Sequence, residues 1–322
     1  MYRVIMAPTE GSDAERGAIS VAAKLAQRFD ADLHLVRVLV PPIITEAVPQ
    51  IPPLKITRQA LAYDRLRRPH KLEALATEVR AGGRIRVTTA LQEGNLTQTL
   101  RDYAAEINAD LIVMSSHSRG GLKRIDLGSV TDFLIRNTHI PVLVVKPDVS
   151  FIDEASDNTA RRIVVPLDGS PLAEEVLPEV AVLAKQLNAS VSLLRVLTAD
   201  TYSQKQVMQR GLPWWDIAVA AANAYLTRTA NYLAHLGVAS TLDVVLSDDV
   251  ARAILDYGKR TGANLIAIAT SGAGGMSRFV FGTVADEVAR RSETSVLVFH
   301  PKRGKISYIT EADADARAMA GA

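Results

Sequence analysis

The sequence predicts an α/β protein of two tandem domains, each built on a doubly wound, five-stranded parallel sheet. Two observations support this fold class. The chain repeats itself, because residues 5–12 return as residues 163–170, with Glu10 and Asp168 at equivalent places 158 positions apart. Within each copy, short apolar runs alternate with helix-like segments, which is the order that builds a parallel sheet with crossover helices.

Later landmarks of the two copies lie 154 positions apart, since Gly128 corresponds to Gly282 and residues 141–145 correspond to residues 295–299. A net four residues are therefore absent from the middle of the second copy. A repeat of this length is a duplicated domain and not a short solenoid unit. Features that both copies keep are then expected to be constrained by the fold or by a site.

The repeat also defines the expected domain organisation of the 322-residue chain. We expect a first domain at residues 1–147, a second domain at residues 160–301 and a tail at residues 302–322. The segment between the two domains is polar and acidic, as in a linker. Each half is long enough to bury a hydrophobic core of its own.

The first copy opens with an apolar run that Pro8 ends, and we interpret residues 3–7 as its first strand. Apolar residues then recur at i, i+3, i+4 and i+7, which predicts a helix over residues 13–29. A proline-rich stretch at residues 41–53 predicts a long loop, because proline lacks the N–H that a helix or central strand needs. The other expected strands are 32–39, 84–91, 110–114 and 141–145, and the other expected helices are 57–81, 96–107 and 128–136.

The second copy follows the same order. Its expected strands are 162–165, 190–197, 240–246, 265–269 and 295–299, and its expected helices are 172–187, 216–236, 250–261 and 284–291. Near-continuous apolar strands joined by helices imply a parallel sheet that is buried on both faces. Right-handed crossovers then give an open, doubly wound, Rossmann-like sheet.

Composition excludes several classes of function. The net charge is +2, from 37 Lys and Arg against 35 Asp and Glu. This excess of basic residues is too small to indicate binding to nucleic acid or to an anionic membrane. The absence of cysteine excludes disulfides and thiolate chemistry, and the six histidines show no metal-ligand spacing. No run of 18 apolar residues occurs, and charged residues among the first 20 argue against a signal peptide, so we expect a cytoplasmic protein.

Ligands of doubly wound sheets bind beyond the carboxyl ends of the strands, so the residues after strands 1, 2 and 4 are candidates. After strand 1 these are Pro8, Thr9 and Glu10 in the first copy and Pro166, Leu167 and Asp168 in the second. The two acidic side chains either stabilise the following helix by lying near its positive N-terminus or contact a ligand. Ser12 and Ser170 are expected to be N-caps of that helix.

After strand 4, each copy has a loop of small residues that leads into a helix N-terminus. The candidates are Ser115, Ser118, Gly128, Ser129 and Val130 in the first copy and Ala269, Gly272, Gly282, Thr283 and Val284 in the second. Glycine lets a backbone approach a ligand closely, and free N–H groups at a helix start cradle phosphate. The alternative is a flexible loop followed by an ordinary helix cap.

With these motifs, nearly all of residues 2–146 and 161–300 resemble the universal stress protein family in its tandem two-domain form. The family signature after strand 4 is Gly, two residues, Gly, nine residues, Gly, and then Ser or Thr. The second copy keeps Gly272 and Gly282 with nine residues between them, although Ala269 replaces the leading glycine. In the first copy, Ser115 and Ser118 replace both earlier glycines.

The resemblance implies a stress-response protein that binds ATP, with or without Mg²⁺, and whose occupancy changes conformation or partners. It implies that the strand 1 acid contacts the adenosine part and that the backbone ending strand 2, at Val38 and Val196, lies beside adenine. The glycine loop and the Gly-Ser or Gly-Thr pair would hold ribose and phosphates. It also suggests that the two copies pack about a pseudo-twofold axis through their last strands, and it leaves a homodimer and a further protein partner open.

The two sites are expected to differ in affinity. Side chains at Ser115 and Ser118 would crowd ribose or phosphate, whereas the second copy adds only the methyl group of Ala269. We therefore expect the second copy to bind ATP more tightly than the first, or alone.

Two other classes of function remain open. One is a nucleotide-free stress adaptor that keeps the fold as an interaction module, which the lost glycines favour. The other is an ATP-consuming enzyme, but His117 and its neighbouring serines lack the motif of a catalytic triad. Because no catalytic base, nucleophile or metal site is evident, we expect at most slow, incidental hydrolysis.

Overall fold

The computed structural model describes residues 2–12, 15–40, 58–116, 127–146, 161–199, 214–270 and 282–300, without the side chains of 58–69 and 214. By its contacts, the chain forms two compact units, residues 1–115 and 116–322. The second unit thus contains the second copy together with the last helix and strand of the first. Within the described ranges, no helix is long and apolar enough to cross a membrane.

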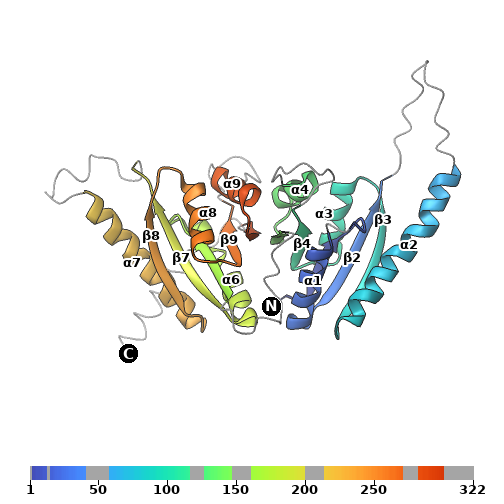
Figure 1. Cartoon of the computed structure of the whole chain (residues 1–322), viewed down its shortest axis with the longest axis horizontal. Helices are drawn as coiled ribbons and strands as arrows, with labels where there is room; N and C mark the ends of the chain where they lie inside the picture. Colours follow the sequence, from blue (N-terminus) through green and yellow to red (C-terminus); the bar gives the residue numbers. More distant parts are fainter. Residues whose placement is uncertain are drawn as a thin grey trace, which may run out of the picture. The chain divides into compact units, whose positions relative to one another are not determined.

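The first unit is a parallel α/β sheet with the strand order β3-β2-β1-β4. Its strands are β1 (Val4–Pro8), β2 (Asp32–Leu39), β3 (Arg86–Glu93) and β4 (Leu111–Ser115). Its helices are α1 (Arg16–Phe29), α2 (Arg58–Ala81) and α3 (Leu96–Glu106). Figure 1 shows β2 and β3 between α2 and α3, so both faces of the sheet are covered.

The second unit holds a complete copy of the fold, with parallel strands in the order β10-β9-β6-β7-β8. Its strands are β5 (Val142–Val145), β6 (Arg161–Pro166), β7 (Ala189–Leu197), β8 (Ser240–Leu246), β9 (Leu265–Ala269) and β10 (Ser295–Phe299). Its helices are α4 (Ser129–Asn137), α5 (Pro171–Glu174), α6 (Leu177–Leu187), α7 (Trp214–His235), α8 (Val250–Arg260) and α9 (Thr283–Arg291). Helices α7 and α8 lie on opposite sides of β7 and β8 (Figure 1). The predicted fold class, an α/β protein with doubly wound parallel sheets, is confirmed.

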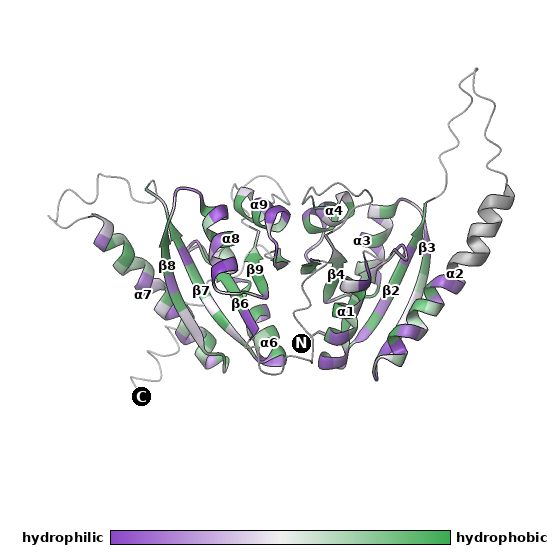
Figure 2. Cartoon of the chain, in the orientation of Figure 1, coloured by the Kyte–Doolittle hydropathy of each residue, from purple (hydrophilic) through white to green (hydrophobic). Residues whose placement is uncertain are grey.

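Apolar strand residues form the core of each unit, as the hydropathy colouring in Figure 2 shows. Ile5 and Met6 of β1 are fully buried because this strand lies between β2 and β4. The edge strands β3 and β8 are only partly buried, and a larger share of their residues is polar than in the inner strands. The carboxyl ends of these buried inner strands lie where a ligand of this fold is expected to bind.

The last strands of the two copies pair antiparallel inside the second unit, as predicted from their apolar character. The register is symmetric, because Leu143 of β5 pairs with its own equivalent, Leu297 of β10. The pseudo-twofold axis between whole copies stays a prediction, but this strand pair has a local twofold relation. The pairing also explains why β5 groups with the second unit. The domain limits at 147 and 160 stay a prediction based on the repeat.

Charged side chains reinforce this pairing where α4 and α9 meet. Asp132 and Arg136 of α4 are equivalent to Asp286 and Arg290 of α9. Arg136 contacts Asp286 at 3.0 Å, and Arg290 contacts Asp132 at 2.6 Å. Each arginine also contacts the aspartate of its own helix at 2.9 Å. The four side chains thus form one closed set of ion pairs between equivalent helices.

Two predictions about helix starts were wrong. Helix α1 begins at Arg16 with Glu15 at the N-cap position, so Ser12 is not its cap. The helix expected over residues 172–187 is divided into α5 and α6, and Pro178 lies in the first turn of α6, where no backbone donor is needed. The prediction for Ser170 is confirmed, because its hydroxyl accepts from the N–H of Ala173 at 3.2 Å.

Candidate ligand-binding site

A pocket of about 150 Å³ opens in the second unit, where parallel strands end and helices begin. Its walls come from the carboxyl ends of β6, β7 and β9 and from the amino ends of α5, α8 and α9. This is the edge at which open α/β sheets bind ligands. The predicted site residues that line it are Pro166, Leu167, Asp168, Val196, Ala269, Thr283 and Val284.

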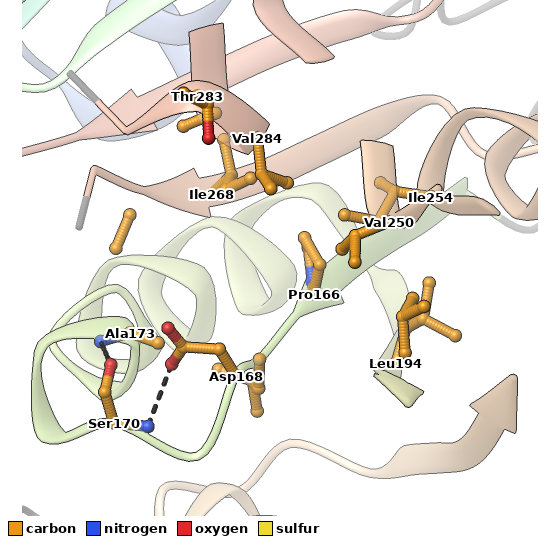
Figure 3. Close-up of a pocket in the computed structure, with 14 residues that line it drawn as sticks. Pro166, Asp168, Ser170, Ala173, Leu194, Val250, Ile254, Ile268, Thr283 and Val284 are labelled. Atoms are coloured by element: carbon orange, nitrogen blue, oxygen red, sulfur yellow. Dashed lines mark hydrogen bonds between the residues drawn. The ribbon is translucent and has the colours of Figure 1, made fainter. Parts of the chain in front are cut away.

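The turn after β6 places Asp168 at one end of the pocket, as Figure 3 shows. The carboxylate of Asp168 is exposed and accepts from the N–H of Ser170 at 2.8 Å. Gly169 has a φ of +82°, a left-handed conformation that favours glycine. Arg195 of β7 stabilises the turn, because its Nη1 donates to the carbonyl of Leu167 at 3.1 Å. Asp168 is therefore held at the rim by the backbone around it.

The start of α9 forms another part of the rim. Gly282 is the N-cap and supplies no side-chain hydrogen bond, and the first helical residues Thr283, Val284 and Ala285 line the pocket. The first N–H groups of a helix have no partner within the helix, and they lie at its positive end. This rim can therefore accept an anionic group. Gly272, predicted to belong to the same site, lies outside the described residues.

Apolar side chains form the inner walls. Leu194 of β7, Ile254 of α8 and Ile268 of β9 are buried and line the pocket together with Val250. Sequence reasoning missed Val250 and Ile254 because it did not consider the helix after strand 3. It missed Leu194 and Ile268 because they precede the ends of their strands. Val250 and Ile254 are four residues apart on α8, and this spacing was the available signal. An apolar interior with a few polar groups at its edge is the usual form of a small-molecule site.

The charge of the pocket is uneven. Asp168 is the one charged side chain among the described lining residues, so basic side chains contribute nothing to that part of the wall. Behind the turn, Glu174 is buried, and burial together with the carboxylate of Glu174 raises the pKa of Tyr225. Tyr225 therefore remains a neutral phenol. Within the described wall, a bound anion would rely on the N–H groups at the start of α9.

The predicted residues of the first copy are divided between the two units. In the first unit, Pro8 and Ser115 end β1 and β4, Thr9 and Val38 are buried, and Glu10 is partly exposed. In the second unit, Gly128 is the N-cap of α4, and Ser129 and Val130 are its first residues. Ser118 lies outside the described residues.

The turn after β1 differs from its counterpart in how its donors are satisfied. The Glu15 carboxylate accepts from the Thr9 hydroxyl at 2.9 Å and from the N–H groups of Glu10 at 2.9 Å, Gly11 at 3.1 Å and Ser12 at 3.3 Å. Gly11 keeps the left-handed φ of +81°, so the backbone of the turn resembles that of the second copy. Sequence reasoning did not identify Glu15 as part of this region.

The doubly wound sheets, and the pocket at the carboxyl edge of the sheet in the second unit, define a Rossmann-like α/β protein with a candidate small-molecule site. The profile of the Universal stress protein family matches residues 1–146 and 159–300. The chain therefore belongs to the universal stress protein family, in a tandem form with two such domains.

Individual relatives agree with this assignment. A universal stress protein of Methanocaldococcus jannaschii is 33% identical over 147 residues, covering 45% of this chain and 83% of that protein. One of Mycolicibacterium smegmatis is 24% identical over 305 residues, covering 92% of this chain and 97% of that protein. The crystal structure of a universal stress protein from Archaeoglobus fulgidus has a TM-score of 0.66 at 18% identity, covering 94% of this chain and 98% of that chain. At this identity, the structural likeness concerns the fold alone.

Proposed function

We propose that the pocket of the second unit binds an adenine nucleotide, ATP with or without Mg²⁺, and that its occupancy changes the conformation or the partners of this stress protein. One observation carries the proposal. Residues predicted from distant parts of the sequence, such as Asp168, Ala269 and Thr283, line the same pocket. Residues that the sequence places at the ends of strands 1 and 4 and at the following helix starts thus form much of the wall of one cavity.

The base and sugar suit the inner part of this pocket. A purine ring is flat and largely apolar on its faces, so it would pack between side chains such as Leu194, Ile254 and Ile268. Val196, near the end of β7, would bring backbone donors and acceptors to the edge of the base. The Asp168 carboxylate can accept hydrogen bonds from the amino or hydroxyl groups of adenosine.

The phosphates suit the start of α9. Its free N–H groups and the Thr283 hydroxyl would donate to phosphate oxygens, and the positive end of the helix favours their negative charge. Asp168 would repel phosphates, which favours an orientation with adenosine at the β6 turn and phosphates at α9.

We expect binding without rapid turnover. ATP hydrolysis requires a group that orients or activates the attacking water and charges that stabilise the transferring phosphoryl group. The described lining offers one carboxylate and no basic side chain for these roles. Nucleotide occupancy would then act as a signal, with hydrolysis slow and incidental.

Calorimetric titration of the full chain with ATP tests this function. Asp168→Ala should lower ATP affinity about 10-fold or more, the effect of losing about one charged hydrogen bond. Gly272→Arg should also weaken binding by filling the glycine loop. Glu10→Ala removes the equivalent acid of the first copy and is the matched control, with binding at the second copy unchanged.

Unchanged ATP affinity in both Asp168→Ala and Gly272→Arg would remove the site from this pocket. A folded wild-type chain that binds no ATP, ADP or AMP would instead support the alternative, a nucleotide-free stress adaptor.

A further inference from the structure

The two copies differ in which groups accept hydrogen bonds from the turn after their first strand. In the first copy, Oε2 of Glu15 lies within hydrogen-bond distance of the Thr9 hydroxyl and three successive backbone N–H groups. Successive N–H groups that converge on one point form a concave anion-binding arrangement. Here the anion is a side chain of the protein itself.

The second copy has no carboxylate at the equivalent place. Ala173 is the equivalent of Glu15, because the two are 158 positions apart, as are Glu10 and Asp168. Ala173 lines the pocket beside Asp168 and Ser170 (Figure 3), and its methyl group is too short to reach the N–H groups of the turn as the Glu15 carboxylate does. The partner of the Glu15 carboxylate is changed as well, because Leu167 replaces Thr9. The second copy thus lacks the counterpart of the Glu15 carboxylate and the hydroxyl that binds it, and its Ser170 N–H donates to Asp168 instead, at 2.8 Å.

From this difference we propose that Glu15 closes the first copy to adenine nucleotide, so that the chain binds one nucleotide, in the second copy. The inference rests on the proposed function of the second pocket. Glu15 acts by two routes: its side chain fills space beside the turn that Ala173 does not fill, and its carboxylate, a stronger acceptor than a neutral amide, occupies turn donors that a ligand would otherwise meet.

This cause differs from the crowding expected at Ser115 and Ser118. Those serines replace glycines in the loop after the fourth strand, whereas Glu15 acts at the turn after the first strand. The two explanations therefore make different predictions for single substitutions.

Transplanting the side chain tests the proposal in the second copy. Ala173→Glu, alone and combined with Leu167→Thr, should lower ATP affinity about 100-fold or more, whereas Ala173→Gln has the same bulk without the charge and should lose less. Such losses are readily measured by calorimetry, since each tenfold corresponds to about 1.4 kcal/mol. Near-normal ATP binding by Ala173→Glu would overturn the proposal.

Removing the carboxylate tests it in the first copy. Wild type should bind one ATP per chain, and Glu15→Ala should raise the stoichiometry to two, with Glu15→Gln as a variant that keeps an acceptor oxygen for the turn. ATP bound at the second copy reports that the variant chain is folded. Two ATP on wild type, or one on both Glu15 variants, would overturn the proposal. A second site that appears only after Ser115→Gly and Ser118→Gly would assign the closure to the serines.

These results separate the inference from the function on which it rests. Absence of ATP binding by wild type contradicts the proposed function and the inference together. Binding of one ATP that Asp168→Ala weakens supports the proposed function, and the Ala173 and Glu15 variants then decide the inference alone.

Discussion

Lys146 follows β5 and is buried against α9, and its replacement gives a quantitative test of this packing. Lys146 is only 6% exposed, and its Nζ donates to the carbonyl of Ala289 in the last turn of α9 at 3.3 Å. Burial lowers the pKa of Lys146 from 10.5 to about 8. The folded protein therefore disfavours the charged amine, and Lys146→Met should stabilise the protein at neutral pH.

The size and pH dependence follow from the pKa of Lys146. One pKa unit corresponds to about 1.4 kcal/mol, so a fall from 10.5 to about 8 corresponds to a cost of about 3 kcal/mol. Between pH 8 and 10.5 the unfolded chain binds more protons at this site, so wild-type stability rises with pH. The full cost is present below pH 8 and is absent above pH 10.5. The lost hydrogen bond to Ala289 would reduce the gain in the variant by about 1 kcal/mol.

Urea denaturation of wild type and Lys146→Met at pH 7 and at pH 10 would measure this effect. We expect the variant to be more stable by about 2 kcal/mol at pH 7 and the difference to become smaller, or to reverse, at pH 10. A variant that is destabilised at pH 7, or whose advantage does not change with pH, would refute the reasoning that burial of the amine controls its ionisation.

Two further predictions concern the same unit. In a double-mutant cycle, Asp132→Ala and Arg290→Ala should show a coupling of about 0.5–1 kcal/mol that weakens in high salt, because the pair at 2.6 Å is partly buried; additive effects would argue against a net contribution. Burial and the nearby His139 lower the pKa of His300 to about 4. Between pH 6.5 and 4 the unfolded chain therefore binds more protons at His300, so stability should decrease as the pH is lowered through this range; His300→Gln should flatten this slope in acid denaturation, and an unchanged slope would contradict the assignment.

Much of the fold could be predicted because burial leaves a direct pattern in the sequence. The strands expected at residues 240–246, 265–269 and 295–299 occur with those bounds, since each is a mostly apolar run limited by polar or turn residues. Helix starts were less predictable. Ser12 resembles an ordinary cap, yet the turn is organised by Glu15, whose long side chain reaches back to it.

The candidate site was predictable in part for the same reason. Asp168 and Thr283 follow strands in sequence, so their place at one edge of the sheet follows from the topology alone. Val250 and Ile254 line the pocket because α8 packs over the ends of other strands. Their spacing predicts a shared helix face, but not which strand ends that face meets. Glu15 and Ala173 occupy the same position of the repeat in the two copies. Only their structural surroundings show that the change of residue there affects the site.

The most direct test of the central claim is to locate a bound nucleotide on the full chain. Photolabelling with 8-azido-ATP followed by peptide mass spectrometry would identify the residues beside adenine. The account predicts labelling of the second copy near Val196 and in other wall segments of its pocket, with protection by excess ATP and loss of labelling in Asp168→Ala. Protectable labelling confined to the first copy, or equal labelling of wild type and Asp168→Ala, would contradict it.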